Sequence, residues 1–515
     1  MEAFPWEFKK GGHNMKKTVF LTGATGNMGS AAFKELYKRR NMYNIVLLIF
    51  EADRKKADDL YKDHYNDPAV RIVWGDLTNY DDVLECVNGS DYVLHVGGLV
   101  SPAADYFPKK TLFTNITAME NIVKAVKAQP DPDSIKVVYI GTVAQTGDRN
   151  YPTHWGRTGD PIQISVYDHY AISKTVAERV LAESGLKYWV SLRQTGILYP
   201  DILKNVDPIM FHVPINGVLE WVTVEDSGRL CAKVCNANVP EKFWRRFYNI
   251  SSGPDYRLSN YEFETLLLNS IGMRGKDVVK RVFEPNWFIL KNFHGQWYTD
   301  ADELEEMLHF RYNVPIKEYF KKLSNSVSPL YKLSAIAPLS LVKTKMMSPI
   351  VKRPLYGTKA WAENGIKDRI TAYYGSLEEY YEIGSWKEFR ILELDKNNMQ
   401  YLDHGYDETK DFDTLGIKDM KKAAEFRGGK CLSIKMGKDM YTPIKWKCAR
   451  GHEFKMSPNL VLKGGHWCPQ CMPMPWRYDE EARLNPFFAQ VWYSHHNKNE
   501  NNVYDMDIYY GFSKE

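Results

Sequence analysis

Short apolar runs recur along the first half of the chain and alternate with segments of helical spacing. The runs are rich in β-branched and aromatic residues, as buried strands are, and they comprise Thr18–Thr22, Asn44–Phe50, Ala69–Leu77, Asp91–Gly98, Lys136–Thr142 and Tyr188–Gly196. Segments such as Ser30–Arg40, between the first two runs, read as helices. This alternation predicts a parallel, doubly wound α/β sheet with ligand at the carboxyl ends of its strands.

A glycine-rich loop directly follows the first run. Gly23, Gly26 and Gly29 stand between the predicted strand and the predicted helix. The first glycine permits a tight turn, the second lets backbone approach a pyrophosphate, and the third lets the helix pack close to the strand. We therefore expect a dinucleotide, NAD or NADP, to contact Gly23, Thr25, Gly26, Asn27, Met28 and Gly29.

The loops after the later strands are expected to open toward the same edge as the glycine loop. Their candidate contacts with the dinucleotide are Asp76, Leu77, Val96, Gly97 and Gly98. After the second run, a carboxylate such as Glu51 would accept the ribose hydroxyls of NAD, whereas a cation such as Arg54 would bind the 2′-phosphate of NADP. The stretch offers both, so the choice between NAD and NADP stays open.

Tyr170 and Lys174 form the candidate proton-transfer pair, on a predicted helix downstream of Thr142. Residues four apart share a helix face. A phenol titrates near ~10 in water, and a neighbouring ammonium lowers its pKa, so such a pair can move protons at neutral pH. The same spacing recurs outside the strand and helix repeat, at Tyr106/Lys110, Tyr406/Lys410, Tyr441/Lys445 and Tyr510/Lys514.

Residues 15 to about 325 resemble an extended short-chain dehydrogenase/reductase of the NAD-dependent epimerase/dehydratase type. The segments that carry the likeness, in chain order, are TGATGNMG, WGDLTNYDDV, VLHVGG, FTNITAMENIV, VVYIGTVAQTG, HYAISKTVAERVL and LRQTGILYP. The resemblance implies a Rossmann-type sheet with a small substrate lobe. It also implies that Tyr170 is the general acid/base, that Lys174 is its electrostatic partner and that Thr142 holds the substrate oxygen.

The resemblance further implies cofactor-site roles for Asp76, at the adenine, and for Asn115, at the helix after the fourth strand. The chain also departs from the family pattern. Val143-Ala144 stand where sugar-nucleotide dehydratases place an Asp-Glu pair, which argues against dehydration, and Tyr199 replaces a usual glycine. Carbonyl/alcohol oxidoreduction and epimerisation of a small-molecule substrate remain, and both begin with hydride transfer.

Composition bears on the cellular setting. The net charge of +4 over 515 residues gives no whole-protein argument for nucleic acid. No apolar run approaches the ~18 residues of a membrane span, and residues 1–14, expected to be an extension, lack the apolar core of a secretory signal. We expect a cytoplasmic protein without a membrane role, and leave homo-oligomerisation open.

The second half begins with a proline-rich stretch, 326–356, that is expected to be a linker, and continues as an α+β domain over 357–515. Within it, about residues 428–475 resemble treble-clef or zinc-ribbon modules. Cys448, His452, Cys468 and Cys471 supply the four ligands of a tetrahedral Zn²⁺ and leave no open position for substrate. The zinc is thus expected to be structural, and its removal to leave hydride transfer largely intact.

These features favour an NAD(P)-dependent oxidoreductase. An epimerase that keeps its nicotinamide bound is the alternative among enzymes. A third hypothesis is a dinucleotide-sensing regulator that binds nucleic acid or protein through the zinc module, whose neighbouring cations include Lys445 and Arg450. The set Thr142, Tyr170 and Lys174 weighs against it, because a sensor needs no proton-transfer pair.

Overall fold

The computed structural model describes residues 16–149, 151, 153–204, 206–236, 238–273, 275, 277–327, 338–472 and 477–504. The expected N-terminal extension and the middle of the expected linker lie outside these ranges. Among the described helices, none combines the length and the apolar character that a bilayer crossing requires.

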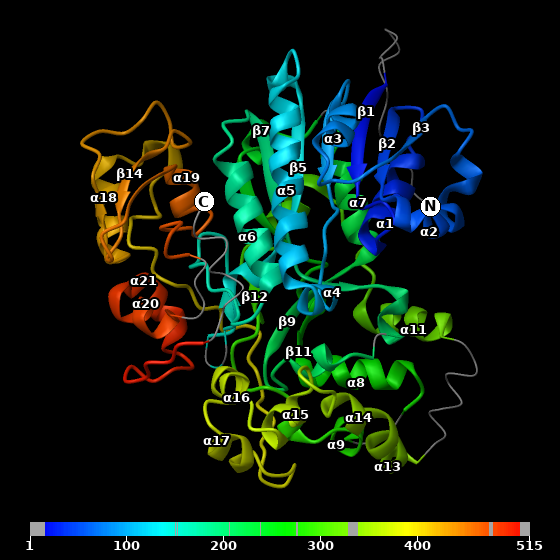
Figure 1. The fold of residues 1–515 in the computed structure, drawn as a ribbon, viewed down its shortest axis with the longest axis vertical. Helices are drawn as coiled ribbons and strands as arrows, with labels where there is room; N and C mark the ends of the chain where they lie inside the picture. Colours follow the sequence, from blue (N-terminus) through cyan, green and yellow to red (C-terminus); the bar gives the residue numbers. More distant parts are fainter. Residues whose placement is uncertain are drawn as a thin grey trace.

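A seven-stranded parallel sheet lies at the centre of the molecule (Figure 1). Its order is β10-β7-β5-β4-β1-β2-β3. The strands are β1 (Lys17–Thr22), β2 (Tyr43–Ile49), β3 (Val70–Trp74), β4 (Tyr92–His95), β5 (Lys136–Thr142), β7 (Tyr188–Gln194) and β10 (Arg246–Ile250). The six predicted runs correspond to β1–β5 and β7, with shifts of a few residues at their ends. The edge strand β10 was not predicted; it lies beyond the repeat and pairs in parallel with β7.

Helices cover both faces of the sheet, as the alternation predicted. Val19 and Leu21 share one core with α1 (Asn27–Tyr37) and α7 (Val224–Val234). Phe20, which points to the opposite face, shares a second core with α3 (Tyr80–Val87), α5 (Pro108–Lys127) and α6 (His169–Ala182). Successive residues of one strand thus face opposite helical layers, and the doubly wound Rossmann-type architecture is confirmed.

A small lobe lies beyond the carboxyl ends of the strands (Figure 1). Its sheet has the order β11-β9-β8, with β8 parallel and β11 antiparallel to β9. The elements of the lobe are β8 (Gly196–Leu198), β9 (Val218–Thr223), β11 (Arg257–Ser259), α8 (Asn260–Ser270), α9 (Val278–Val282) and α11 (Ile316–Ser326). A further pair, β6 (Trp155–Gly156) with β12 (Trp297–Tyr298), joins the segment before α6 to the lobe.

Part of the expected linker packs on this lobe. The short helical elements α13 (Leu339–Leu341), η11 (Val342–Met347) and α14 (Ser348–Val351) follow one another there. Leu339, Val342, Met347 and Val351 are buried in one cluster with residues of α9 such as Val279. Residues 338–351 therefore belong to a packed core, because apolar side chains recur on their inner face.

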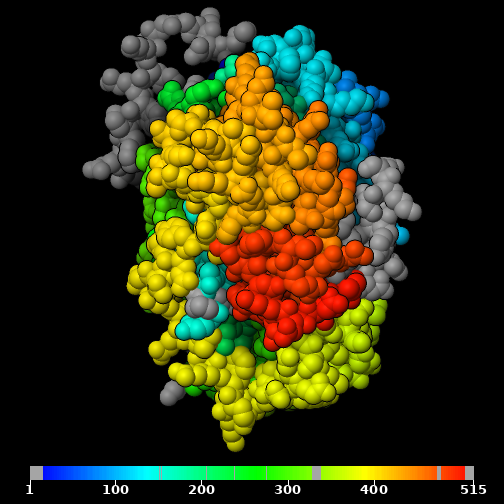
Figure 2. Space-filling model, turned by 90° about the vertical axis from the view of Figure 1, so that its left-hand side faces the viewer, coloured from blue at the N-terminus to red at the C-terminus, as the bar shows by residue number. Residues whose placement is uncertain are grey.

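The remaining chain forms a mixed α/β region along one side of the molecule. It holds a three-stranded antiparallel sheet and flanking helices: α15 (Thr358–Glu363), α16 (Lys367–Tyr373), α17 (Leu377–Glu382), α18 (Ile417–Phe426), β13 (Lys430–Cys431), β14 (Ile444–Lys447), β15 (Glu453–Met456), α19 (Pro458–Leu462), α20 (Tyr478–Leu484) and α21 (Pro486–Trp492). Figure 2 shows this side covered by these residues, in yellow, orange and red. Trp189 of β7 and Phe247 of β10 share a core with Leu460 and Leu462 of α19.

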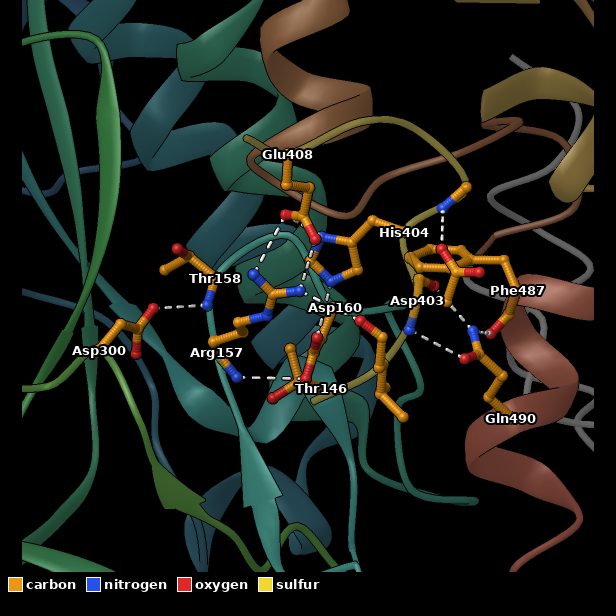
Figure 3. A network of polar contacts seen from close by, with 12 residues as sticks. Thr146, Arg157, Thr158, Asp160, Asp300, Asp403, His404, Glu408, Phe487 and Gln490 are labelled. Atoms are coloured by element: carbon orange, nitrogen blue, oxygen red, sulfur yellow. Dashed lines mark hydrogen bonds and ion pairs between the residues drawn. The ribbon is translucent and has the colours of Figure 1, made fainter. Parts of the chain in front are cut away.

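A buried polar junction joins the segment before α6 to the C-terminal half (Figure 3). His404, 1% exposed, lies between Asp160 and Glu408, with nitrogen to oxygen distances of 2.9 and 3.0 Å. Arg157 donates to Glu408 at 2.6 Å. Burial by itself raises the pKa of Glu408, but His404 and Arg157 outweigh it and lower that pKa to about 2. The carboxylate charge therefore helps to hold the two halves together.

Candidate active site

The glycine loop closes tightly at the end of β1. Gly23 has a φ of +68°, and a Cβ there would lie 2.6 Å from Gly97 Cα. A Cβ on Gly29 would lie 2.0 Å from the carbonyl oxygen of Gly23. The side chain of Thr22 fixes the neighbouring loop, because its Oγ1 accepts from Gly97 N at 2.8 Å. A side chain at Gly23 or Gly29 would collide with backbone, which is consistent with the tight turn and the close helix packing predicted for these two positions.

The first turn of α1 fits an anionic pyrophosphate. The helix begins at Asn27 after Gly26, and no side chain caps its N-terminus. The N–H groups of a helix's first turn lack intrahelical partners, and they form the positive end of the helix dipole. Since the glycine loop and this turn line one cavity, the cradle suits a dinucleotide.

That cavity has a volume of about 890 Å³ and lies at the carboxyl edge of the sheet. Most of the predicted contacts line it together: Gly23, Thr25, Gly26, Asn27, Met28, Gly29, Asp76, Leu77, Val96, Gly97, Gly98, Thr142, Tyr170 and Lys174. Glu51, Arg54 and Asn115 are not among its lining residues. The glycine loop and the proton-transfer candidates thus share one cavity.

The two predicted ribose-selecting residues bind each other. Arg54 Nε and Nη2 donate to the Glu51 carboxylate at 2.7 and 2.8 Å, and the guanidinium lies 3.9 Å from the Trp74 ring centroid. From this stretch Asp53 and Lys56 line the cavity instead, and Thr25 Oγ1 donates to the Asp53 carboxylate at 2.8 Å. The short turn Glu51–Asp53 determines which of the two nearby carboxylates faces the cavity. Their positions in the sequence alone could not have shown which one.

Asn115 acts on the backbone beside the cavity. Its amide accepts from Leu99 N at 2.8 Å and donates to Leu99 O at 2.9 Å. It also donates to Ser173 Oγ at 2.8 Å. This buried side chain therefore ties the loop after β4 to α6, the helix that carries Tyr170 and Lys174.

Thr142 ends β5, and Tyr170 and Lys174 lie one turn apart on α6. Asp168 caps α6 by accepting from Ala171 N at 2.8 Å. Burial lowers the pKa of Lys174 to about 7, against the opposing charge of Glu178. Burial also raises the pKa of Tyr170 to about 12, although a hydrogen bond with Thr142 opposes this.

The Tyr170 pKa is raised, rather than lowered as the spacing predicted. The ammonium of Lys174 lies 4.4 Å from the centroid of the Tyr139 ring, a cation–π contact. Removal of Tyr170 from water outweighs the polar contacts that would favour its phenolate. Both residues line the cavity, and burial outweighs the contacts that would bring the Tyr170 pKa toward neutrality.

The far end of the cavity includes residues that sequence reasoning assigned to another domain. Trp361, Arg369 and Tyr373, from α15 and α16, line it together with Tyr167. Arg369 lies 3.7 Å from the Tyr167 ring centroid, and the Trp361 and Tyr373 rings stack at 5.2 Å. No sequence signal connects these positions to the glycine loop, because only tertiary packing brings them there.

The four predicted zinc ligands converge. Their ligand atoms all lie within 4.8 Å of one another. His452 Nδ1 is 3.2 Å from Cys471 Sγ and 3.7 Å from Cys468 Sγ, and the Sγ atoms of Cys448 and Cys471 are 3.8 Å apart. Ideal tetrahedral Zn–S and Zn–N bonds place such ligand pairs about 3.5–3.8 Å apart, so the donor set fits zinc.

Two other residues of the zinc module, Cys431 and His466, contact groups outside the set of four ligands. Cys431 is buried, and its Sγ faces the Ser433 carbonyl. His466 contacts Glu178 on α6 at 2.9 Å. Of the cations expected to allow nucleic-acid binding, Arg450 pairs with Glu480 and Lys447 lies 3.8 Å from Glu453.

Comparison with known proteins finds similarity in the first part of the chain. A family model described as the NAD dependent epimerase/dehydratase family matches residues 19–196, about a third of the chain. UDP-glucose 4-epimerases of Rickettsia bellii (strain RML369-C) and Rickettsia conorii are each 32% identical over 111 residues, which is 21% of this chain. The match spans 32% of the length of these curated relatives.

Solved structures overlap with a larger share of the chain, at lower sequence identity. A dTDP-glucose 4,6-dehydratase from Streptomyces venezuelae with NAD and DAU bound is 18% identical, with a TM-score of 0.46, over 60% of this chain and 96% of that one. The Bordetella bronchiseptica enzyme WbmH in complex with NAD+ is 20% identical, with a TM-score of 0.46, over 61% and 98%. Residues 19–196, which hold the glycine loop, Thr142, Tyr170 and Lys174, are therefore similar to the NAD dependent epimerase/dehydratase family.

Proposed function

We propose that the protein is an NAD-dependent oxidoreductase of the short-chain type, which interconverts a secondary alcohol and a ketone on a small-molecule substrate. The observation that carries this proposal is the single cavity lined by the glycine loop, Thr142, Tyr170 and Lys174. A bound nicotinamide would accept the hydride in oxidation and supply it in reduction.

NAD is the preferred cofactor in this proposal, and NADP the alternative. Asp53 lines the cavity, where a carboxylate can accept the ribose hydroxyls and would repel a 2′-phosphate. The Arg54 guanidinium is held by Glu51. Gly23, Gly26 and the first turn of α1 would hold the pyrophosphate, with Asp76 and Leu77 toward the adenine.

In this mechanism the chain's own residues handle the substrate oxygen and its proton. Thr142 Oγ1 donates a hydrogen bond to the substrate oxygen. In oxidation the Tyr170 phenolate would take the hydroxyl proton as the carbon loses hydride, and in reduction the neutral Tyr170 phenol would donate that proton to the substrate oxygen. Lys174 favours the Tyr170 phenolate while it is protonated.

Replacing Tyr170 by phenylalanine tests the proposal. General acid–base groups contribute on the order of 10²–10⁴ in rate, so Tyr170→Phe should lose at least about a hundredfold in turnover while binding of NADH, measured by fluorescence, stays unchanged. The matched control is Tyr441→Phe, which has the same spacing to a lysine outside the cavity. Full activity in Tyr170→Phe would sink the assignment.

Epimerisation is the second candidate, because curated relatives similar to part of this chain, such as that of Rickettsia bellii, are UDP-glucose 4-epimerases. An epimerase would retain its dinucleotide through purification and invert a carbinol centre without net redox change. Mass spectrometry of the purified protein, followed by an NADH oxidation screen, separates the two. We also infer a structural Zn²⁺ held by Cys448, His452, Cys468 and Cys471, which metal analysis would test.

A further inference from the structure

The small-lobe wall of the cavity holds a buried carboxyl group with one oxygen unpaired among the described residues. Glu264, on α8, lines the cavity and is 2% exposed. Among the described residues no hydrogen-bond partner reaches its Oε2 atom. Glu178, equally buried, contrasts with it, because Arg193, Gln145 and Ser191 all donate to that carboxylate. A buried polar atom left unpaired costs stability, so the needs of folding do not explain a glutamate at position 264.

An unpaired donor lies on the same wall. Trp221, at 8% exposure, lines the cavity from β9, and within the described chain its Nε1 atom has no acceptor. The indole is firmly placed: it stacks on Phe263 with ring centroids 4.2 Å apart and 16° between planes. A Cβ on Gly196 would lie 2.6 Å from its ring, so glycine there makes room for it. The wall thus presents one fixed donor and one acceptor.

Most of the other residues on this wall are apolar: Ile202, Met210, Val213, Leu219 and Leu267. Asn260 of α8 also lines the cavity, but its amide already donates to Val213 O at 3.3 Å. Between Gln194 and His294, the described residues that line the cavity include no lysine or arginine. Burial lowers the pKa of His212 to about 4, so this imidazole is neutral at pH 7. Such a wall disfavours a phosphate or carboxylate.

Burial also bears on the state of Glu264 itself. Removal from water raises its pKa to about 8, so the carboxyl group is largely protonated at pH 7 and can donate as well as accept. A hydroxyl, which has one donor and two acceptor lone pairs, satisfies Glu264 and Trp221 alike, whereas a purely apolar group would leave both unpaired.

We propose that the small-lobe wall binds an uncharged, largely apolar part of the substrate through a hydroxyl group recognised by Glu264 and Trp221. This inference rests on the proposed oxidoreductase function and names the substrate class. The recognised hydroxyl is distinct from the reacting oxygen, which Thr142 and Tyr170 hold at the carboxyl edge of the large sheet.

Two ketones that differ by one hydroxyl provide the test: benzylacetone and its para-hydroxy derivative. Their dissociation constants are measured by calorimetry on the full-length protein with NAD+ present. One satisfied hydrogen bond corresponds to about a tenfold gain in affinity, so the hydroxylated ketone should bind about tenfold more tightly. Glu264→Leu should abolish that advantage, and Trp221→Phe, which keeps a ring but loses the N–H, should reduce it.

Controls separate recognition from folding. Glu262→Gln changes an exposed carboxylate on the same helix and should preserve the tenfold advantage. Glu264→Gln retains the size of the side chain and can still donate and accept, so it should keep most of the advantage. Because no partner reaches Glu264 Oε2 among the described residues, Glu264→Leu should raise the urea midpoint. A lower midpoint, or a failure to fold, would assign Glu264 a structural role and overturn the proposal.

Three other results would also overturn the proposal. The two ketones could bind with equal affinity, the advantage of the hydroxylated ketone could survive in Glu264→Leu, or neither ketone could bind. Turnover is recorded separately with NADH. Ketones that bind with the predicted preference but are not reduced would contradict the oxidoreductase function and leave the hydroxyl site standing. Reduction of both ketones at equal affinity would support the oxidoreductase function and contradict the hydroxyl site.

Discussion

Glu178 links the zinc module to the helix that carries Tyr170 and Lys174, and replacing it with glutamine is the sharpest test of that link. Its carboxylate accepts from Arg193 at 2.7 and 3.0 Å and from His466 at 2.9 Å. Arg193 also donates to Gly464 O at 2.7 Å. Burial by itself raises the pKa of Glu178, but Arg193 and His466 hold it well below its ordinary value.

The size of the effect follows from burial. Glu178 and Arg193 side chains are both 0% exposed, so Glu178→Gln leaves a guanidinium in the interior without its counter-charge. Breaking a buried ion pair from one side costs about 3–5 kcal/mol. Domains commonly have about 5–15 kcal/mol of stability, so the loss is a large share.

Urea denaturation, followed by tryptophan fluorescence, measures the change in unfolding free energy. Hydrogen exchange should localise it, with faster exchange in α6 and in residues 457–472. Reduction by NADH should change too: Glu178 opposes the fall in the Lys174 pKa, so the variant lowers that pKa further below about 7. Lysine is charged only below its pKa, and the loss of activity on raising pH should therefore begin at lower pH.

A destabilisation below about 1 kcal/mol would refute this reasoning, since that is the usual value of an exposed pair. Glu85→Gln is the matched control. Glu85 pairs with Arg71 at 3.2 Å, and both side chains are about half exposed. An unchanged pH profile alongside a large loss of stability would restrict Glu178 to a structural role.

Two further outcomes follow from the cofactor cradle and the zinc module. Gly29→Ala should weaken NADH binding at least about tenfold, because the new Cβ would lie 2.0 Å from Gly23 O. The control is Gly416→Ala, whose Cβ would have no atom within 4 Å. Equal NADH binding by the two variants would contradict the role of the glycine loop in holding the dinucleotide. Chelation, or Cys471→Ser, should lower the melting temperature and also turnover, because Ser457 donates at 2.6 Å to Glu183, the residue directly after α6. Metal loss that spares turnover would support the independence expected from sequence.

Local sequence determined the elements whose partners lie close along the chain. The strand, glycine loop and helix over residues 17–37 depend on spacing within one turn, and a Tyr-x-x-x-Lys pair on a helix shares a face by geometry alone. The zinc ligands come from two short knuckles of similar locality. For these features, residue type and spacing were sufficient to predict which side chains meet.

Tertiary structure alone decided the features that depend on distant packing. Asp53 faces the cavity in place of Glu51 because a short turn directs it there, and Arg369 and Trp361 reach the substrate end because α15 and α16 fold back onto the cavity. The partnerless state of Glu264 and the contact of His466 with Glu178 likewise have no sequence pattern. Burial and hydrogen bonding are properties of three-dimensional neighbours, and single-chain periodicity does not encode which neighbours those are.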